Sequence, residues 1–139
     1  MTKAIVFFDL DGTLLNDKTQ LDPEVIKAVA QLKANDVLPV IATGRNIFEI
    51  KNVIQQTQID TLVSANGAYI VLRGKPVDVT EIPKDVIKRL TALVKNHDDA
   101  YATLNNQTDR INRMIDNVKK VYHYINSPIP IICLLYTSD

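Results

Sequence analysis

Two acidic residues and a glycine come directly after an apolar run near the start of the chain. Asp9 and Asp11 follow the apolar segment 4–8, and Gly12 and Thr13 come next. Side chains alternate along an extended chain, so Asp9 and Asp11 are expected to face one ligand together. Two carboxylates this close repel each other unless a cation or a shared proton relieves the repulsion. In this context, the pattern favours a nucleophile and a magnesium site over an ordinary acidic turn.

The chemistry that suits this pair is phosphoryl transfer. A carboxylate nucleophile splits hydrolysis into two steps through an acyl-phosphate, and Asp9 is the candidate for the attack. Asp11, one pleat further on, is the candidate general acid and base, which protonates the leaving alcohol and then activates water. Mg²⁺ prefers oxygen ligands, and Asp9 and the backbone carbonyl of Asp11 would supply part of its shell.

A second short motif, Thr43-Gly44-Arg45, follows the apolar segment 37–42. The hydroxyl of Thr43 and the N–H of Gly44 are candidates for binding phosphate at the start of the next helix, where the helix terminus favours anions. Arg45 is a candidate contact to phosphate or substrate, or a surface partner of Glu49 one turn later. Asn66 lies in an Asn-Gly turn and is a further candidate for the cleft.

The segments that position these motifs alternate between strands and helices. The expected elements are strands over 4–10, 37–42 and 61–64, a helix that begins with Asp22 and Pro23, and a helix over 47–54. This alternation is typical of an α/β fold with a parallel, helix-covered sheet and right-handed crossovers. Strand 4–10 is apolar nearly throughout, which predicts that it is covered on both faces. Both motifs lie at carboxyl ends of strands, where such sheets bind ligands.

The pattern changes after Gly67. The remaining sequence predicts a hairpin around Gly74, a helix from Pro83, a strand over 101–104, a helix over 111–124 and an apolar tail over 128–139. The tail is either a final buried strand or a place where the natural sequence is cut or replaced.

Composition restricts the function classes. Sixteen basic residues balance sixteen acidic ones in 139 residues, so no basic excess indicates nucleic acid as a partner. No apolar run approaches the roughly 20 residues that span a membrane. The start of the chain lacks a signal peptide, which predicts a cytoplasmic protein. The single cysteine, Cys133, is expected to be a buried apolar residue, and His97 and His123 are expected at the surface.

The motif over 9–15, together with Thr43-Gly44-Arg45, resembles those of the haloacid dehalogenase-like hydrolases. The segment 64–68, Ser-Ala-Asn-Gly-Ala, is similar to one found in the Cof-type phosphatases of that superfamily. The resemblance covers residues 1–82 well and the remainder loosely. It implies a Rossmann-like core, a Mg²⁺ cofactor and a small phosphorylated metabolite, such as a sugar phosphate, as substrate.

The resemblance also implies roles for individual residues. Asp9 would accept the phosphoryl group and bind Mg²⁺, and Asp11 would be the general acid and base with its carbonyl on the metal. Leu10 would offer its backbone N–H to the phosphate, together with Thr43 and Gly44. An aspartate at position 11 is typical of the phosphatase or phosphotransferase form of the motif, not of the dehalogenase form.

The same resemblance predicts how the chain is divided. Residues 1–80 would be the N-terminal part of the core, 81–127 part of an α/β cap inserted after the third strand, and 128–139 a tail of uncertain origin. The family also needs a lysine and a later Gly-Asp with a further aspartate, and these residues are not found here in the proper context. The chain is therefore expected to resemble the N-terminal half of a phosphatase and to have little or no activity alone.

Other functions fit parts of the sequence. A phosphomutase would use the same chemistry, and a non-catalytic fragment would only bind phosphate or a partner. A response-regulator receiver domain also has acids after its first strand, but it needs an aspartate at the end of strand three. Here that strand, 61–64, ends without one.

Overall fold

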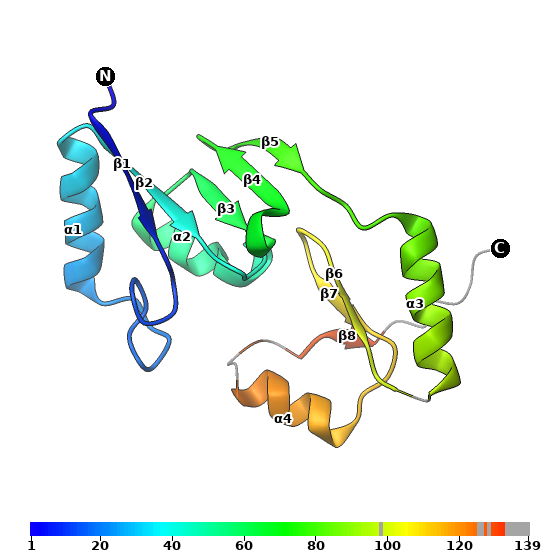
Figure 1. The fold of residues 1–139 in the computed structure, drawn as a ribbon. Helices are drawn as coiled ribbons and strands as arrows, with labels where there is room; N and C mark the ends of the chain where they lie inside the picture. Colours follow the sequence, from blue (N-terminus) through cyan, green and yellow to red (C-terminus); the bar gives the residue numbers. More distant parts are fainter. Residues whose placement is uncertain (98, 125–126, 128, 133–139) are drawn as a thin grey trace. The chain divides into compact units, whose positions relative to one another are not determined.

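The computed structural model describes residues 1–97, 99–124, 127 and 129–132. The chain divides into two compact units, Met1–Thr80 and Glu81–Asp139, and each is described by itself. Unit 1 contains the first five strands and two α-helices, and unit 2 contains three strands and two α-helices (Figure 1). The predicted α/β class is confirmed.

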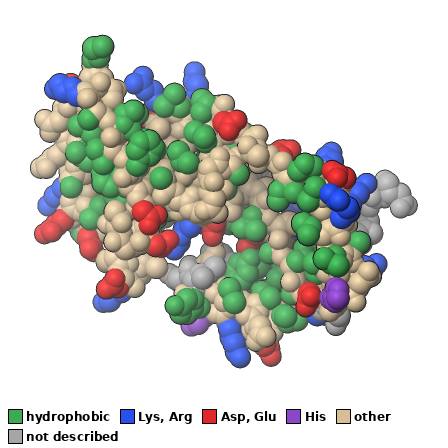
Figure 2. Space-filling view, in the orientation of Figure 1, with side chains coloured by type: hydrophobic (Ala, Val, Ile, Leu, Met, Phe, Trp, Pro, Cys, Tyr) green, Lys and Arg blue, Asp and Glu red, His purple; other side chains and the backbone are tan. Residues whose placement is uncertain are grey.

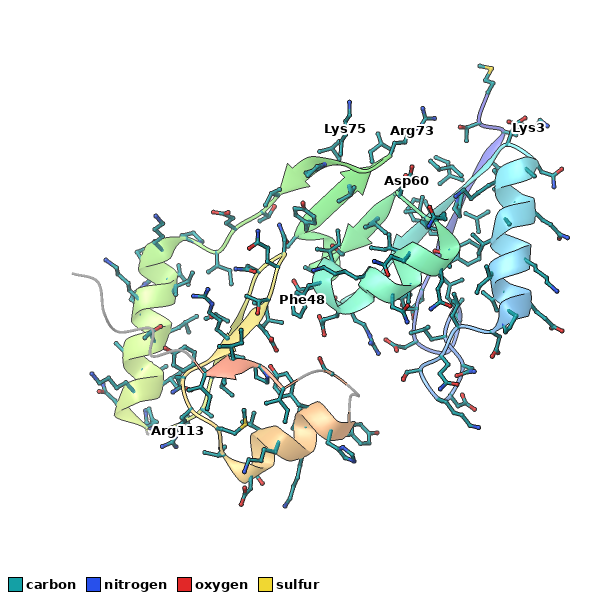
Figure 3. The ribbon with its side chains drawn as sticks, turned by 180° about the vertical axis from the view of Figure 1, so that it is seen from behind. Lys3, Phe48, Asp60, Arg73, Lys75 and Arg113 are labelled. Atoms are coloured by element: carbon teal, nitrogen blue, oxygen red, sulfur yellow. The ribbon has the colours of Figure 1, made fainter. Side chains whose placement is uncertain are left out.

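Unit 1 is a five-stranded sheet in the order β1-β2-β3-β4-β5. Strands β1, β2 and β3 run parallel, and β4 and β5 continue the sheet in antiparallel pairs. Helices α1 and α2 lie on the same face of this sheet (Figures 1 and 3), as right-handed crossovers between successive parallel strands require. The bounds are β1 Ala4–Phe8, α1 Pro23–Ala34, β2 Val37–Ala42, α2 Lys51–Thr57, β3 Leu62–Ser64, β4 Tyr69–Leu72 and β5 Lys75–Val79.

The sequence signals for α1 and β2 act as predicted. Helix α1 has Asp22 as its N-cap residue and Pro23 at its first position, where the missing proline N–H costs nothing. Val29 is 2% exposed and joins the core on the inner face of α1. Strand β2 accommodates Pro39 because β3 pairs only with Ile41 and Ala42, beyond the proline.

A buried cluster fills the space between the sheet and its helices. Leu10, Ile41, Ile50, Ile59 and Leu62 are each no more than 2% exposed and belong to it. These side chains come from strands, from the turn after β1 and from the helical segment, so the core joins the segments that carry the motifs.

The β4–β5 hairpin turns as its sequence predicts. Arg73 and Gly74 both have positive φ, 50° and 75°, which is the geometry of a type I′ turn. This turn joins the paired residues Leu72 and Lys75.

The second helical segment begins at Ile47, as predicted, but its first turn is not α-helical. A 3-10 helix, η1, spans Ile47–Ile50, and α2 begins only at Lys51. Asn46 is the N-cap residue of η1, and Glu49 returns to cap it, since Asn46 N–H donates to Glu49 Oε2 at 2.8 Å. The prediction that Thr43 and Gly44 lie at a helix start is therefore wrong, because both precede this capping box.

Strand β1 is shorter and more exposed than its apolar sequence predicts. It ends at Phe8, and the chain turns from Leu10 onward. Ile5 is 55% exposed and Phe7 62% exposed, on the face away from the helices, and β1 is an edge strand of the described sheet. Figure 2 shows hydrophobic side chains gathered on this side of unit 1. The expectation of burial on both faces is wrong for the residues described.

Unit 2 has a three-stranded sheet in the order β6-β7-β8. The predicted helix over 111–124 is wrong in its first part, because Ile111 ends a strand antiparallel to β6. A short strand, β8, pairs in parallel with β7. The rest of the tail over 133–139, including Cys133, lies outside the described residues. The bounds are α3 Lys84–Asn96, β6 Ala102–Leu104, β7 Asp109–Ile111, α4 Asp116–Tyr124 and β8 Ile131–Ile132.

The two histidines and the helices were also compared with what the sequence predicts. His97 and His123 are exposed, as expected. Among the helices of the described part of the chain, none combines the length and apolar character needed to cross a membrane.

Candidate active site

The turn after β1 holds its acids outward and its leucine inward. Asp9 and Asp11 are exposed, whereas Leu10 between them is 0% exposed and belongs to the core cluster. Leu15 N–H donates to the carbonyl of Leu10 at 2.8 Å, which closes the turn. Gly12, at φ 76°, has the left-handed backbone that this reversal requires. The predicted alternation of the acids is therefore retained beyond the end of β1.

The two acids have different partners. The carboxylate of Asp9 has no hydrogen-bond or ion-pair partner among the described residues. The carboxylate of Asp11 accepts two hydrogen bonds from Arg45, from Nε to Oδ2 at 3.1 Å and from Nη2 to Oδ1 at 2.6 Å. Asp9 is therefore free to react, while Asp11 is held from the end of the neighbouring strand.

Thr43 and Gly44 follow β2, beside the turn after β1. The hydroxyl of Thr43 accepts the Arg45 N–H at 3.1 Å, which leaves its own proton available to another acceptor. The N–H groups of Leu10 and Gly44 donate to no residue in the described ranges. These three donors suit the oxygens of a phosphate, and the phosphate-binding roles of their residues stay a prediction.

Asn66 lies against the Thr43-Gly44 turn. Its N–H donates to the Thr43 carbonyl at 3.3 Å, and its Oδ1 lies 2.9 Å from the point where a Cβ on Gly44 would be. Ala65 and Asn66 both have left-handed backbones, with φ of 51° and 55°, within the turn η2 (Ala65–Gly67). Such conformations are unfavourable for alanine, and strain of this kind is often found at functional sites.

Sequence reasoning missed two features of this site. The capping box of Asn46 and Glu49 has a local signal, an Asn followed three residues later by Glu, that would have shown that Thr43 and Gly44 precede the helix. The pairing of Arg45 with Asp11 joins residues 34 positions apart and has no local signal. The predicted alternative, a pair between Arg45 and Glu49, is wrong because Glu49 binds the N–H of Asn46 instead.

The metal ligands expected from the sequence are oxygen atoms of the first turn. Asp9 offers a free carboxylate, and no described N–H donates to the backbone carbonyl of Asp11. Both atoms suit Mg²⁺, which prefers oxygen ligands and keeps several waters. Within the described residues, no group of three or more His, Cys, Asp or Glu side chains is arranged to hold a metal ion. Two acids thus provide only part of a shell.

A hollow of unit 1 lies at the opposite end of the sheet. It has a volume of about 250 Å³ and is lined by residues that precede β2 and β3, with Arg73 from the hairpin. Figure 3 shows Asp60 and Arg73 at this end. Lys33, which lines this hollow, donates a hydrogen bond from its ammonium group to the Gln58 carbonyl at 2.6 Å. Ligands of parallel sheets bind at the other, carboxyl end, and we assign this hollow no catalytic role.

Comparison with known proteins identifies related chains. A family model described as haloacid dehalogenase-like hydrolase matches residues 6–134. Phosphatase YwpJ of Bacillus subtilis (strain 168) is 39% identical over 67 residues, which are 48% of this chain and 24% of that protein. The HMP-PP phosphatase of Escherichia fergusonii is 31% identical over 81 residues, 57% of this chain and 30% of that protein.

A solved structure agrees over nearly all of this chain. The crystal structure of a hypothetical protein from Geobacillus kaustophilus HTA426 superposes with a TM-score of 0.90 at 29% identity. It covers 98% of this chain, whereas this chain covers 53% of it. The chain therefore spans about half the length of that solved relative, and 24–30% of the two curated ones.

Proposed function

The chain belongs to the haloacid dehalogenase-like hydrolase family, as its motifs predicted, and we propose that it carries the phosphoryl-accepting part of a phosphatase. The proposed reaction is the magnesium-dependent hydrolysis of a phosphate ester through an aspartyl-phosphate. The observation that carries the proposal is the contact between the turn after β1 and the turn after β2, made by Arg45 and Asp11. This contact joins the two turns that carry the proposed nucleophile and the proposed phosphate-binding donors, which supports their acting on one phosphate group.

In the first step, a carboxylate oxygen of Asp9 attacks phosphorus, and the bond from phosphorus to the ester oxygen breaks. Asp11 gives a proton to the departing alcohol. The hydroxyl of Thr43 and the N–H groups of Leu10 and Gly44 hold the phosphate oxygens. Donors that are already directed at these oxygens lose no energy to reorganisation as negative charge develops.

In the second step, Asp11 takes a proton from water, and the water oxygen attacks phosphorus. The bond between phosphorus and Asp9 then breaks, which releases inorganic phosphate and restores the carboxylate. The carboxylate of Asp9 and the carbonyl of Asp11 would hold Mg²⁺. When bound, the ion would neutralise charge between the carboxylate and the phosphate.

The proposed substrate is a small phosphorylated metabolite, such as a sugar phosphate. The relative from Escherichia fergusonii, an HMP-PP phosphatase, supports this class. We propose that unit 2 is part of a cap that selects the leaving group. Turnover by the chain alone is expected to be little or none, because its described acids supply only part of a metal site.

A binding experiment with a phosphoryl mimic tests the proposal without relying on turnover. The chain should bind beryllofluoride only when Mg²⁺ is present, which ¹⁹F NMR detects directly. Asp9→Asn should abolish this binding, because an amide oxygen cannot replace the carboxylate in the acyl-phosphate mimic.

The control is Asp60→Asn, which removes a carboxylate at the other end of the same unit and should leave binding unchanged. Magnesium-dependent binding that survives Asp9→Asn would refute the proposal. Measurable magnesium-dependent turnover that Asp9→Asn abolishes would leave the proposed reaction intact but overturn the expectation that the chain alone is inactive.

A further inference from the structure

The geometry points to Arg45 as the positioning residue of Asp11: its guanidinium holds both carboxylate oxygens and so fixes the direction in which Asp11 faces. This inference rests on the proposed function, because it concerns the residue assigned to proton transfer. It replaces the roles predicted from the sequence, a direct contact to phosphate or a pair with Glu49.

The first support is the form of the contact. Nε and Nη2 of Arg45 donate to different oxygens of Asp11, at 3.1 and 2.6 Å, in the two-pronged arrangement that a guanidinium makes with a carboxylate. Two parallel hydrogen bonds fix both the position and the rotation of the carboxyl group. A single-point cation, such as a lysine ammonium, would fix only the position.

The second support is that Arg45 is itself held more firmly than Asp11. Its N–H donates to the Thr43 hydroxyl at 3.1 Å, and its carbonyl accepts the Ala65 N–H at 3.0 Å. Its side chain is 25% exposed, whereas that of Asp11 is 54% exposed. The direction of control is therefore from Arg45 to Asp11, because Arg45 is the more buried side chain and its backbone is bound to Thr43 and Ala65.

The third support comes from a matched pair elsewhere in the chain. Arg89 and Asp85 form an ion pair on α3 with one contact of 3.5 Å, and both side chains are 75% exposed. Exposed pairs of this kind contribute little and do not hold a fixed geometry. The pair of Arg45 and Asp11 differs in having two contacts and a partly buried arginine, which is what a positioning role requires.

The experiment measures the side-chain rotamer of Asp11 by NMR, from three-bond couplings between its carboxyl carbon and the backbone. We expect one rotamer in the unchanged chain, averaging over several rotamers in Arg45→Met, and an intermediate result in Arg45→Lys. Arg89→Met is the control, and it should leave the Asp11 couplings unchanged. A fixed Asp11 rotamer in Arg45→Met would overturn the inference.

A second measurement separates positioning from direct contact with phosphate. The affinity for Mg²⁺ with beryllofluoride should fall by less than about tenfold in Arg45→Met, because the change loosens the joined turns but removes no group that touches the phosphoryl mimic. A loss of about tenfold or more would show that Arg45 contacts that group and would overturn the inference.

The two proposals fail in different ways. Absence of magnesium-dependent beryllofluoride binding in the unchanged chain would count against the proposed function, while the couplings of Asp11 would still decide the role of Arg45. If Arg45→Met does not fold, as its ¹H–¹⁵N spectrum would show, Arg45→Lys decides alone. A rotamer as fixed in Arg45→Lys as in the unchanged chain would then contradict the two-pronged role.

Discussion

The two units contain amphipathic helices of similar length, yet among the described residues only those of unit 1 form a buried apolar cluster. Helix α1 buries Val29 against the sheet of unit 1, whereas α3 and α4 bury none of their described side chains. Leu90 and Leu93 of α3 are 52% and 55% exposed. An apolar stripe is thus sufficient to predict a helix, but burial depends on a partner surface that the stripe does not specify.

The largest effect expected from this difference is in the core of unit 1. Ile41→Ala should lower the free energy of unfolding by about 2–5 kcal/mol, because Ile41 is 0% exposed and its removal leaves a cavity. The matched change Leu93→Ala in α3 should alter it by less than about 0.5 kcal/mol. Urea titrations followed by circular dichroism measure both. Equal losses in the two variants would show that Leu93 is packed in solution and would contradict the difference between the two units.

A smaller effect is expected from the buried isoleucine of unit 2. Ile111 is 1% exposed, and Ile111→Ala should destabilise its unit by about 2 kcal/mol, at the low end for such changes, because the surrounding side chains can relax into part of the cavity. Amide hydrogen exchange should accelerate in β6 and β7 while β1, β2 and β3 keep their protection. Acceleration of the same size in both units would mean that they unfold together.

The smallest expected effect concerns the contact between Gly44 and Asn66 in the candidate site. In Gly44→Ala, the new Cβ would lie 2.9 Å from Asn66 Oδ1, the end of a side chain that can turn away, so the overlap should cost no more than about 1 kcal/mol of stability. Asn66→Gly removes that oxygen and tolerates the left-handed backbone, so the double variant should recover most of the loss. A double-mutant cycle by urea titration measures this coupling. Strictly additive losses would show that the two residues do not touch.

Local patterns predicted the parts of the fold that local forces determine. The apolar segment 37–42, the proline at the start of α1 and the glycine of the hairpin all led to elements with nearly the predicted bounds. The predicted helix over 111–124 was wrong at its start because an apolar residue such as Ile111 fits a helix or a strand equally well. Its pairing with β6 determines that it lies in a strand.

The sequence proposed the members of the candidate site but could not give the contacts between them. Asp9, Thr43 and Gly44 lie where the motifs placed them, at neighbouring strand ends. Arg45 pairs with Asp11 because the sheet brings the turns after β1 and β2 together. From charge alone, Glu49 was an equally good partner for Arg45. The exposure of Phe7 was unpredictable for a related reason, since an apolar strand does not reveal which face is covered.

The burial of Leu10 has a consequence for the energetics of ligand capture. Because this side chain is 0% exposed, the turn that carries Asp9 and Asp11 loses its conformational freedom when the core forms. A ligand that arrives later meets an ordered turn and does not have to immobilise it. Packing of the core therefore also orders the site before a ligand binds. A substitution that loosens the packing around Leu10 should weaken ligand affinity before it unfolds the chain.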